Sequence, residues 1–177
     1  MDSFIDLEHV DVFTAGAVGE PGRRVFYLQA RTPPRTVTVR CEKQQVATIS
    51  TYLRRALADL PVPEGQPPRS AMTLQTPLDE EFVLGAVALE FSASGASFAL
   101  YLKELTIAES TSGDEEDDED DSDEDITSGA RIRVGLTAAQ AMAFCDHSDR
   151  IVAAGRPNCV YCDRPIDPDG HFCPRMN

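Results

Sequence analysis

No apolar run in this chain of 177 residues is long enough to cross a bilayer, so the sequence predicts no membrane span. The opening residues, Met1-Asp2-Ser3-Phe4-Ile5-Asp6, have no basic region followed by an apolar stretch, and we expect no signal peptide. The five cysteines are an odd number, and four of them, Cys145, Cys159, Cys162 and Cys173, lie near the C-terminal end instead of spreading as a disulfide framework. Reduced thiols of this kind favour a cytoplasmic location.

Several motifs of catalysis are also missing. The chain has no G-x-S-x-G sequence, no glycine loop of the kind that cradles phosphate, and no dinucleotide-binding fingerprint. We therefore expect a non-enzymatic binding or regulatory protein with an unidentified protein partner. An enzyme, or an enzyme subunit, with a pocket between its sheet and helices remains the alternative.

The net charge of −14 comes mostly from one short segment. Between Asp114 and Asp125, eleven of twelve residues are acidic, and only Ser122 interrupts them. Removing these 11 from the 30 acidic residues leaves 19 against 16 basic residues, so the rest of the chain is close to neutral. The composition predicts a disordered acidic insertion over 109–127. The alternatives are an electrostatic attraction for a basic partner and weak binding of divalent cations. A dedicated calcium loop is not indicated, because the ligand spacing is wrong.

The clearest chemical pattern lies near the C-terminal end. Cys159 and Cys162 form a C-x2-C pair, and His171 and Cys173 follow it in the order C-x2-C-x8-H-x-C. Three thiolates and one imidazole are a common set of structural zinc ligands, and four protein ligands leave no open position for a reacting water. The sequence therefore predicts a structural zinc site that supplies most of the folding free energy of this short segment.

Other interpretations of the same residues remain open. Cys159 and Cys162 could form a thiol–disulfide redox pair, although a Pro/Asp loop follows them instead of a helix N-terminus. They could also be unconnected thiols. Cys145 or His147 could replace one of the four ligands, so the identity of the fourth ligand is open. Nucleic acid is not an indicated partner, because only three arginines lie near the motif and the acidic run is close in sequence.

Hydrophobic periodicity indicates an α+β fold. Alternating apolar residues predict strands, and a spacing of three and four predicts helices. Thr137 with Gln140 three residues later is a capping box, which predicts the start of the second helix. We expect strands at 4–18, 25–30, 36–40, 82–91, 98–107 and 131–136, with helices at 42–60 and 137–155 and a proline-rich loop at 61–77.

This order places three strands and a helix before a second set of three strands and a helix. It predicts an antiparallel sheet with two helices, and either a duplicated βββα unit or a coincidence of pattern explains the repetition. We expect one α+β domain over 1–108 and 128–156, followed by a zinc-binding C-terminal motif over 157–177.

Three internal stretches and the closing motif resemble a known family. The stretches begin at Gly16-Ala-Val-Gly-Glu-Pro-Gly, at Glu42-Lys-Gln-Gln-Val and at Arg133-Val-Gly-Leu-Thr, and the closing motif includes Asp167-Pro-Asp-Gly-His-Phe-Cys-Pro-Arg. Together they are similar to DUF3090, a family of uncharacterised actinobacterial proteins. The resemblance covers nearly the whole chain outside the acidic run, which looks peculiar to this sequence. It implies no established activity.

Overall fold

The computed structural model describes residues 3–92, 97–106, 129–155, 158–166 and 170–176. The acidic insertion expected at 109–127 lies outside these residues. The elements, in chain order, are β1 (Phe4–Leu7), β2 (Val12–Val18), β3 (Val25–Thr32), β4 (Arg35–Cys41), α1 (Lys43–Leu57), the 3-10 helix η1 (Arg69–Met72), β5 (Glu80–Ser92), β6 (Ser97–Glu104), β7 (Arg131–Thr137) and α2 (Ala138–Ala153).

The strands form one sheet of seven in the order β1-β7-β6-β5-β4-β3-β2. The α+β class with two helices is therefore confirmed. The sheet is mixed, whereas the sequence predicted an antiparallel one, because β1 pairs with β7 and β4 pairs with β5 in parallel. The β4–β5 pairing follows from the connection: α1 carries the chain across the sheet, and such a crossover returns a strand in the same direction.

Two βββα units follow one another along the chain, as the sequence pattern indicated. The first contains β2, β3, β4 and α1, and the second contains β5, β6, β7 and α2. The first predicted strand, 4–18, was wrong in extent, because the chain there forms two strands at opposite ends of the sheet. β1 pairs with β7, and β2 pairs with β3. Both pieces are apolar, so their composition does not reveal the break between them.

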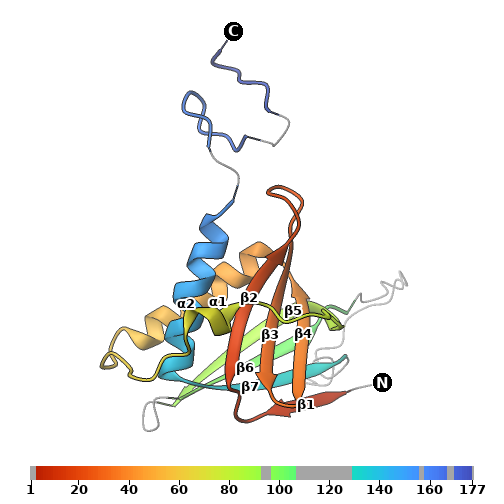
Figure 1. Cartoon of the computed structure of the whole chain (residues 1–177), viewed down its shortest axis with the longest axis vertical. Helices are drawn as coiled ribbons and strands as arrows, with labels where there is room; N and C mark the ends of the chain where they lie inside the picture. The colour runs from red at the N-terminus through yellow and green to blue at the C-terminus, as the bar shows by residue number, and fades with distance from the viewer. Residues whose placement is uncertain (1–2, 93–96, 107–128, 156–157, 167–169, 177) are drawn as a thin grey trace, which may run out of the picture.

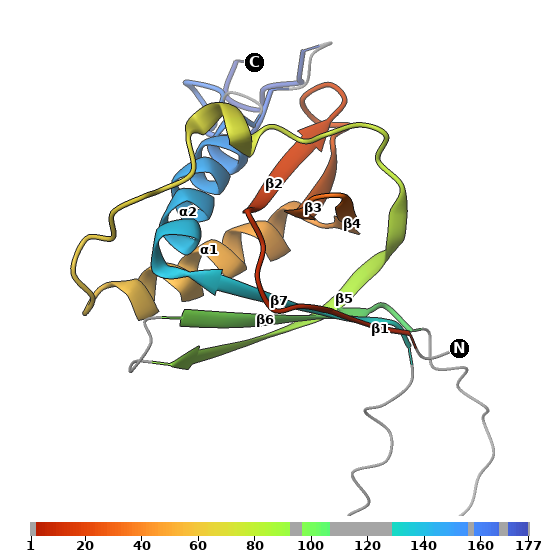
Figure 2. The ribbon, with the colours of Figure 1, turned by 60° about the horizontal axis from the view of Figure 1, so that its bottom comes forward.

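The sheet bends along β5. Its first residues, Glu80 and Val83, pair with β4, and from Leu84 onward the strand pairs with β6. The register shifts between Leu84 and Ala86, so Gly85 lies at the change of partner. A Cβ atom on Gly85 would lie 2.8 Å from the Cα of Leu105, so the close approach of the chain there requires glycine. Figures 1 and 2 show the resulting halves, with both helices lying over the layer of β5, β6 and β7 and with β2, β3 and β4 turned up beside them.

Both helices begin at a capping box. At α2 the side chain of Thr137 accepts a hydrogen bond from the N–H of Gln140, as predicted, and Glu42 begins α1 in a similar way. The core is one cluster between the sheet and the helices. Phe144 of α2 is fully buried and stacks on Phe13 of β2, with ring centroids 4.8 Å apart. This pair joins the helix of the second unit to a strand of the first.

The other face of β2 and β3 carries buried polar side chains that hold the segment around η1. Thr14 donates to the backbone carbonyl of Met72 at 2.6 Å, and Arg31 donates to the carbonyl of Ala71. Gln29 both donates to the Gln75 carbonyl and accepts from the Gln75 N–H, each at 2.9 Å. The predicted loop at 61–77 therefore contains a short helix and covers this face of the sheet.

Candidate metal centre

The C-x2-C pair lies in a tight hairpin within residues 158–176, here called the terminal segment. The Cys159 N–H donates to the carbonyl of Arg164, and the Asp163 N–H donates to the carbonyl of Cys159, both at 2.8 Å. Asp163 has a φ of 59°, a left-handed conformation that aspartate tolerates better than most residues. Its carboxylate also accepts a hydrogen bond from the side chain of Asn158. The turn therefore sets Cys159 and Cys162 on one side of the hairpin.

The structure brings the four predicted ligands together. The Sγ atoms of Cys159 and Cys173 lie 3.8 Å apart, and the Sγ of Cys162 lies 3.3 Å from the Nε2 of His171. All four donor atoms lie within 4.8 Å of one another. The side chains of Cys159 and Cys173 are buried, whereas those of Cys162 and His171 are partly exposed.

This arrangement fits a tetrahedral metal ion. With metal–sulfur bonds of about 2.3 Å, two thiolates on a tetrahedral zinc lie about 3.8 Å apart. The distance between Cys159 and Cys173 has this value. It is also too long for a disulfide bond, and all five cysteines are free thiols. The residues Cys159, Cys162, His171 and Cys173 can therefore hold a metal ion.

Backbone hydrogen bonds prepare Cys159 for this role. The N–H groups of Tyr161 and Cys162 bond to its sulfur and lower its pKa, which favours the thiolate that a metal requires. At Cys173, burial raises the pKa, although a hydrogen bond from the N–H of Arg175 acts in the opposite direction. A bound cation would stabilise both thiolates, since a coordinating thiol is deprotonated outright.

The two residues considered as substitute ligands lie on α2, outside the terminal segment. Cys145 is fully buried on α2, where its Sγ lies 3.5 Å from the carbonyl oxygen of Ser50 on α1. Burial raises its pKa to about 11. His147 is half-buried on α2 and bonds to the backbone of Ala15 in β2, and burial lowers its pKa. Both side chains therefore have structural contacts elsewhere in the fold.

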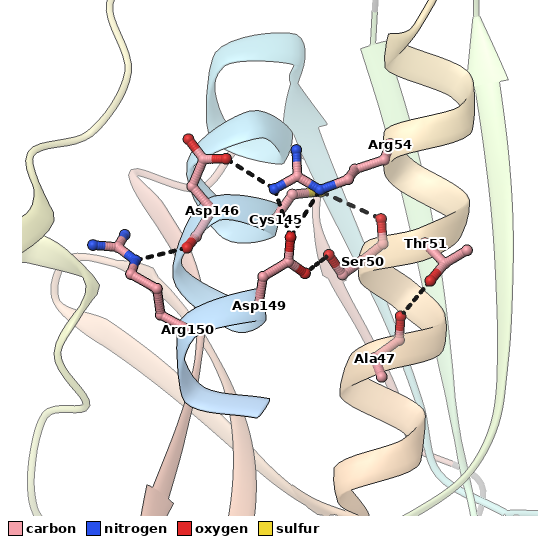
Figure 3. A network of polar contacts seen from close by, with 8 residues as sticks. All are labelled: Ala47, Ser50, Thr51, Arg54, Cys145, Asp146, Asp149 and Arg150. Atoms are coloured by element: carbon pink, nitrogen blue, oxygen red, sulfur yellow. Dashed lines mark hydrogen bonds and ion pairs between the residues drawn. The ribbon is translucent and has the colours of Figure 1, made fainter. Parts of the chain in front are cut away.

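Another polar cluster, not predicted from the sequence, joins the two helices (Figure 3). Arg54 of α1 contacts Asp146 at 2.9 Å and Asp149 at 2.6 Å, and both carboxylates belong to α2. Asp149 also accepts a hydrogen bond of 2.7 Å from Ser50. The members are 92 to 99 residues apart in sequence, so no local pattern indicates them. The cluster fixes α2 against α1.

The terminal segment also exposes large apolar side chains beside the candidate metal ligands. Val160 is 90% exposed and Phe172 is 77% exposed, and each lies next to a ligand in sequence. Tyr161 and Met176 are exposed as well. Exposed apolar side chains gathered in so short a segment are typical of an interaction surface.

A groove of 480 Å³ lies between α1 and β5. This is the place at which the sequence allowed a pocket. Its walls come from the polar side of α1 and from the apolar face of β5 and β6: Gln44, Gln45, Thr48, Ile49, Tyr52, Gly85, Val87, Leu89 and Leu100. Its lining residues include no carboxylate, imidazole, amine or thiol.

Comparison with known proteins gives one match. Residues 5–173 match DUF3090, a family described as proteins of unknown function. No curated protein and no solved structure matches the chain significantly. In the part of the chain that the structure describes, no helix is both long and apolar enough to cross a membrane. The family match spans the sheet, both helices and all four candidate ligands, and the chain therefore belongs to the DUF3090 family.

Proposed function

We propose that this protein is a cytoplasmic, non-enzymatic binding or regulatory module whose terminal segment is held by a structural zinc ion. The observation that carries the proposal is the convergence of three sulfurs and one imidazole within 4.8 Å. When bound, the zinc ion supplies structural cross-linking of the segment. Cys159, Cys162, His171 and Cys173 would hold it, and a full set of four protein ligands suits a structural role.

The exposed apolar residues give this structural role a purpose. Val160 and Tyr161 lie between the first two ligands, and Phe172 lies between the last two. Fixing the ligands therefore fixes the positions of these side chains. A protein partner is the expected occupant, because large apolar and aromatic side chains carry much of the energy of protein interfaces. We do not propose a nucleic acid or membrane partner.

The test is the metal content of the full chain, purified without added zinc and measured by elemental analysis. We expect about one zinc per chain, because a Cys3His set is a complete structural site. Cys162→Ser should lose the zinc. Cys145→Ala and His147→Ala are matched controls that should retain it. Wild-type protein without metal would refute the zinc proposal, and loss of zinc in either control would assign the fourth ligand differently.

A second candidate function is a thiol-redox response. It is favoured by the 3.8 Å distance between the sulfurs of Cys159 and Cys173. The sequence had instead suggested Cys159 and Cys162 as the redox pair. Oxidation by a peroxide would join the thiolates of Cys159 and Cys173 in a disulfide and reduce the peroxide to water, with loss of two metal ligands. Treating the zinc-loaded protein with hydrogen peroxide, while zinc release is followed with a chromogenic chelator, tests this candidate. Retention of zinc would exclude it.

A further inference from the structure

A small pocket lies where three parts of the fold meet. Arg24 and Phe26 line it from the β2–β3 hairpin, Lys43 from the first residue of α1, and Ile151 and Gly155 from the C-terminal end of α2. Figures 1 and 2 both show the hairpin tip and the end of α2 at the same end of the molecule. The pocket has a volume of 210 Å³. Pockets for drug-sized ligands have roughly 300–1,000 Å³, so this one suits a smaller ligand.

The charged residues of this pocket are all cations. Arg24 and Lys43 line it, and no carboxylate does. Within the described residues neither of them forms an ion pair, and the ion pairs found there involve Arg54 and Arg133. Glu42, the neighbour of Lys43 in sequence, takes part in the capping box of α1 and does not line the pocket. The pocket therefore presents two positive charges with which no carboxylate of the described residues pairs.

The surrounding structure positions both cations. A Cβ atom built on Gly155 would lie 3.1 Å from the Nζ of Lys43, so this ammonium group lies close against the backbone just after α2. The last carbonyls of a helix favour a cation at that place. The rest of Lys43 is exposed, so an anion from solution can reach its charge. Arg24 is half-buried, and partial burial restricts its long side chain before a ligand arrives.

Two cations in one small pocket match a phosphate group better than a carboxylate. A phosphate ester carries about −1.5 to −2 charge at pH 7, whereas a carboxylate carries a single charge. A guanidinium group binds two phosphate oxygens at once, and a lysine ammonium binds phosphate as a point charge. The other large side chains of the lining, those of Pro21, Phe26 and Ile151, are apolar and suit the carbon atoms of an ester.

We propose that this pocket binds the phosphate group of a small molecule, either free phosphate or a short phosphate ester, and that Arg24 and Lys43 hold it. The anion neutralises two like charges that line the same pocket. None of the four candidate metal ligands lines this pocket, so the inference does not depend on the zinc site.

Isothermal titration calorimetry of the full chain with inorganic phosphate tests the proposal. Chloride keeps the ionic strength constant, so that a general salt effect does not contribute. We expect one phosphate per chain, with a dissociation constant on the order of 0.1–1 mM for a ligand of so few atoms. Arg24→Gln and Lys43→Gln should each raise this constant by about tenfold or more, because each removes a hydrogen bond to a charged group. Arg69→Gln removes an exposed arginine on η1 and should leave the constant unchanged.

Glycerol 3-phosphate distinguishes the two sources of the phosphate group. Tighter binding of this ester than of inorganic phosphate would identify a phosphate ester as the ligand, and weaker binding would identify the free anion. Circular dichroism verifies that each variant is folded.

Three outcomes would overturn the proposal. The first is the absence of saturable phosphate binding in the millimolar range. The second is binding that persists unchanged in both Arg24→Gln and Lys43→Gln, because the anion would then lie elsewhere. The third is tighter binding of propionate than of either phosphate compound, because the pocket would then favour a carboxylate.

Discussion

Replacing Phe144 by alanine should test whether the two βββα units form one cooperative structure. Phe144 belongs to α2 of the second unit and is fully buried against Phe13 of the first unit's β2. Their rings are nearly parallel, at 23°, with centroids 4.8 Å apart. Among the contacts between a helix and a strand in the described residues, the contact of α2 with β2 is the most extensive. The substitution therefore opens a cavity at the junction of the units.

We expect Phe144→Ala to lower the free energy of unfolding by about 3–5 kcal/mol, which is the usual cost of truncating a buried phenylalanine. Of this, about 0.5–1.5 kcal/mol belongs to the interaction between the two rings. The loss is a large part of the roughly 5–15 kcal/mol by which domains are stable.

Urea unfolding followed by far-ultraviolet circular dichroism measures this loss, because the chain has no tryptophan for fluorescence. Phe4→Ala is the matched control: Phe4 is 56% exposed, and its truncation should cost less than about 1 kcal/mol. The Phe144→Ala transition should remain single, with an unchanged dependence on urea. A loss below about 1 kcal/mol would refute the conclusion that the Phe13–Phe144 pair holds the units together, and two separate transitions in the wild type would refute a single cooperative structure.

Three further predictions concern other side chains. Arg54→Met should lower the free energy of unfolding by about 0.2–1 kcal/mol in low salt, and by less in high salt, because the ion pair with Asp149 is exposed. Urea unfolding at two salt concentrations measures this loss. Burial lowers the pKa of His147, so the unfolded chain binds a proton at this residue more readily than the folded chain does. The contribution of His147 to stability should therefore be complete above about pH 6.5 and fall as the pH drops below it. His147→Gln should reduce this dependence in pH-dependent melting. Burial raises the pKa of Cys41 to about 12 and that of Cys145 to about 11. Iodoacetamide at pH 8 should therefore modify only the three terminal cysteines of the folded, metal-stripped protein. Mass spectrometry would detect any early reaction of Cys41 or Cys145.

Local patterns in the sequence predicted the parts of the fold that depend on neighbouring residues. The capping box of Thr137 and Gln140 acts over one helical turn, and the structure contains it. The four candidate metal ligands span only fifteen positions, and turn residues between them constrain the chain, so their convergence also follows from local spacing.

Contacts between distant residues could not be predicted in this way. Nothing in the sequence around Ser50 indicates that it bonds to Asp149, which is 99 positions away. Phe144 lies on the buried face of α2 with Ala141 and Cys145, but the pattern of the helix does not indicate that its ring stacks on Phe13 of β2. The groove depends on how far α1 covers β5, and the side-chain pattern of either element does not set that coverage.

The pairing of β1 with β7 has a consequence for synthesis of the protein. Asp6 and Arg133, which form an ion pair across these strands, are 127 residues apart. At roughly 5–20 residues per second, the ribosome needs on the order of ten seconds to deliver β7 after β1 has emerged. The first strand made is therefore among the last to find its place, and a chain interrupted before residue 131 has no partner for it. During that interval the N-terminal end is a site where chaperones or proteases would act, and added N-terminal tags would compete with the pairing that completes the sheet.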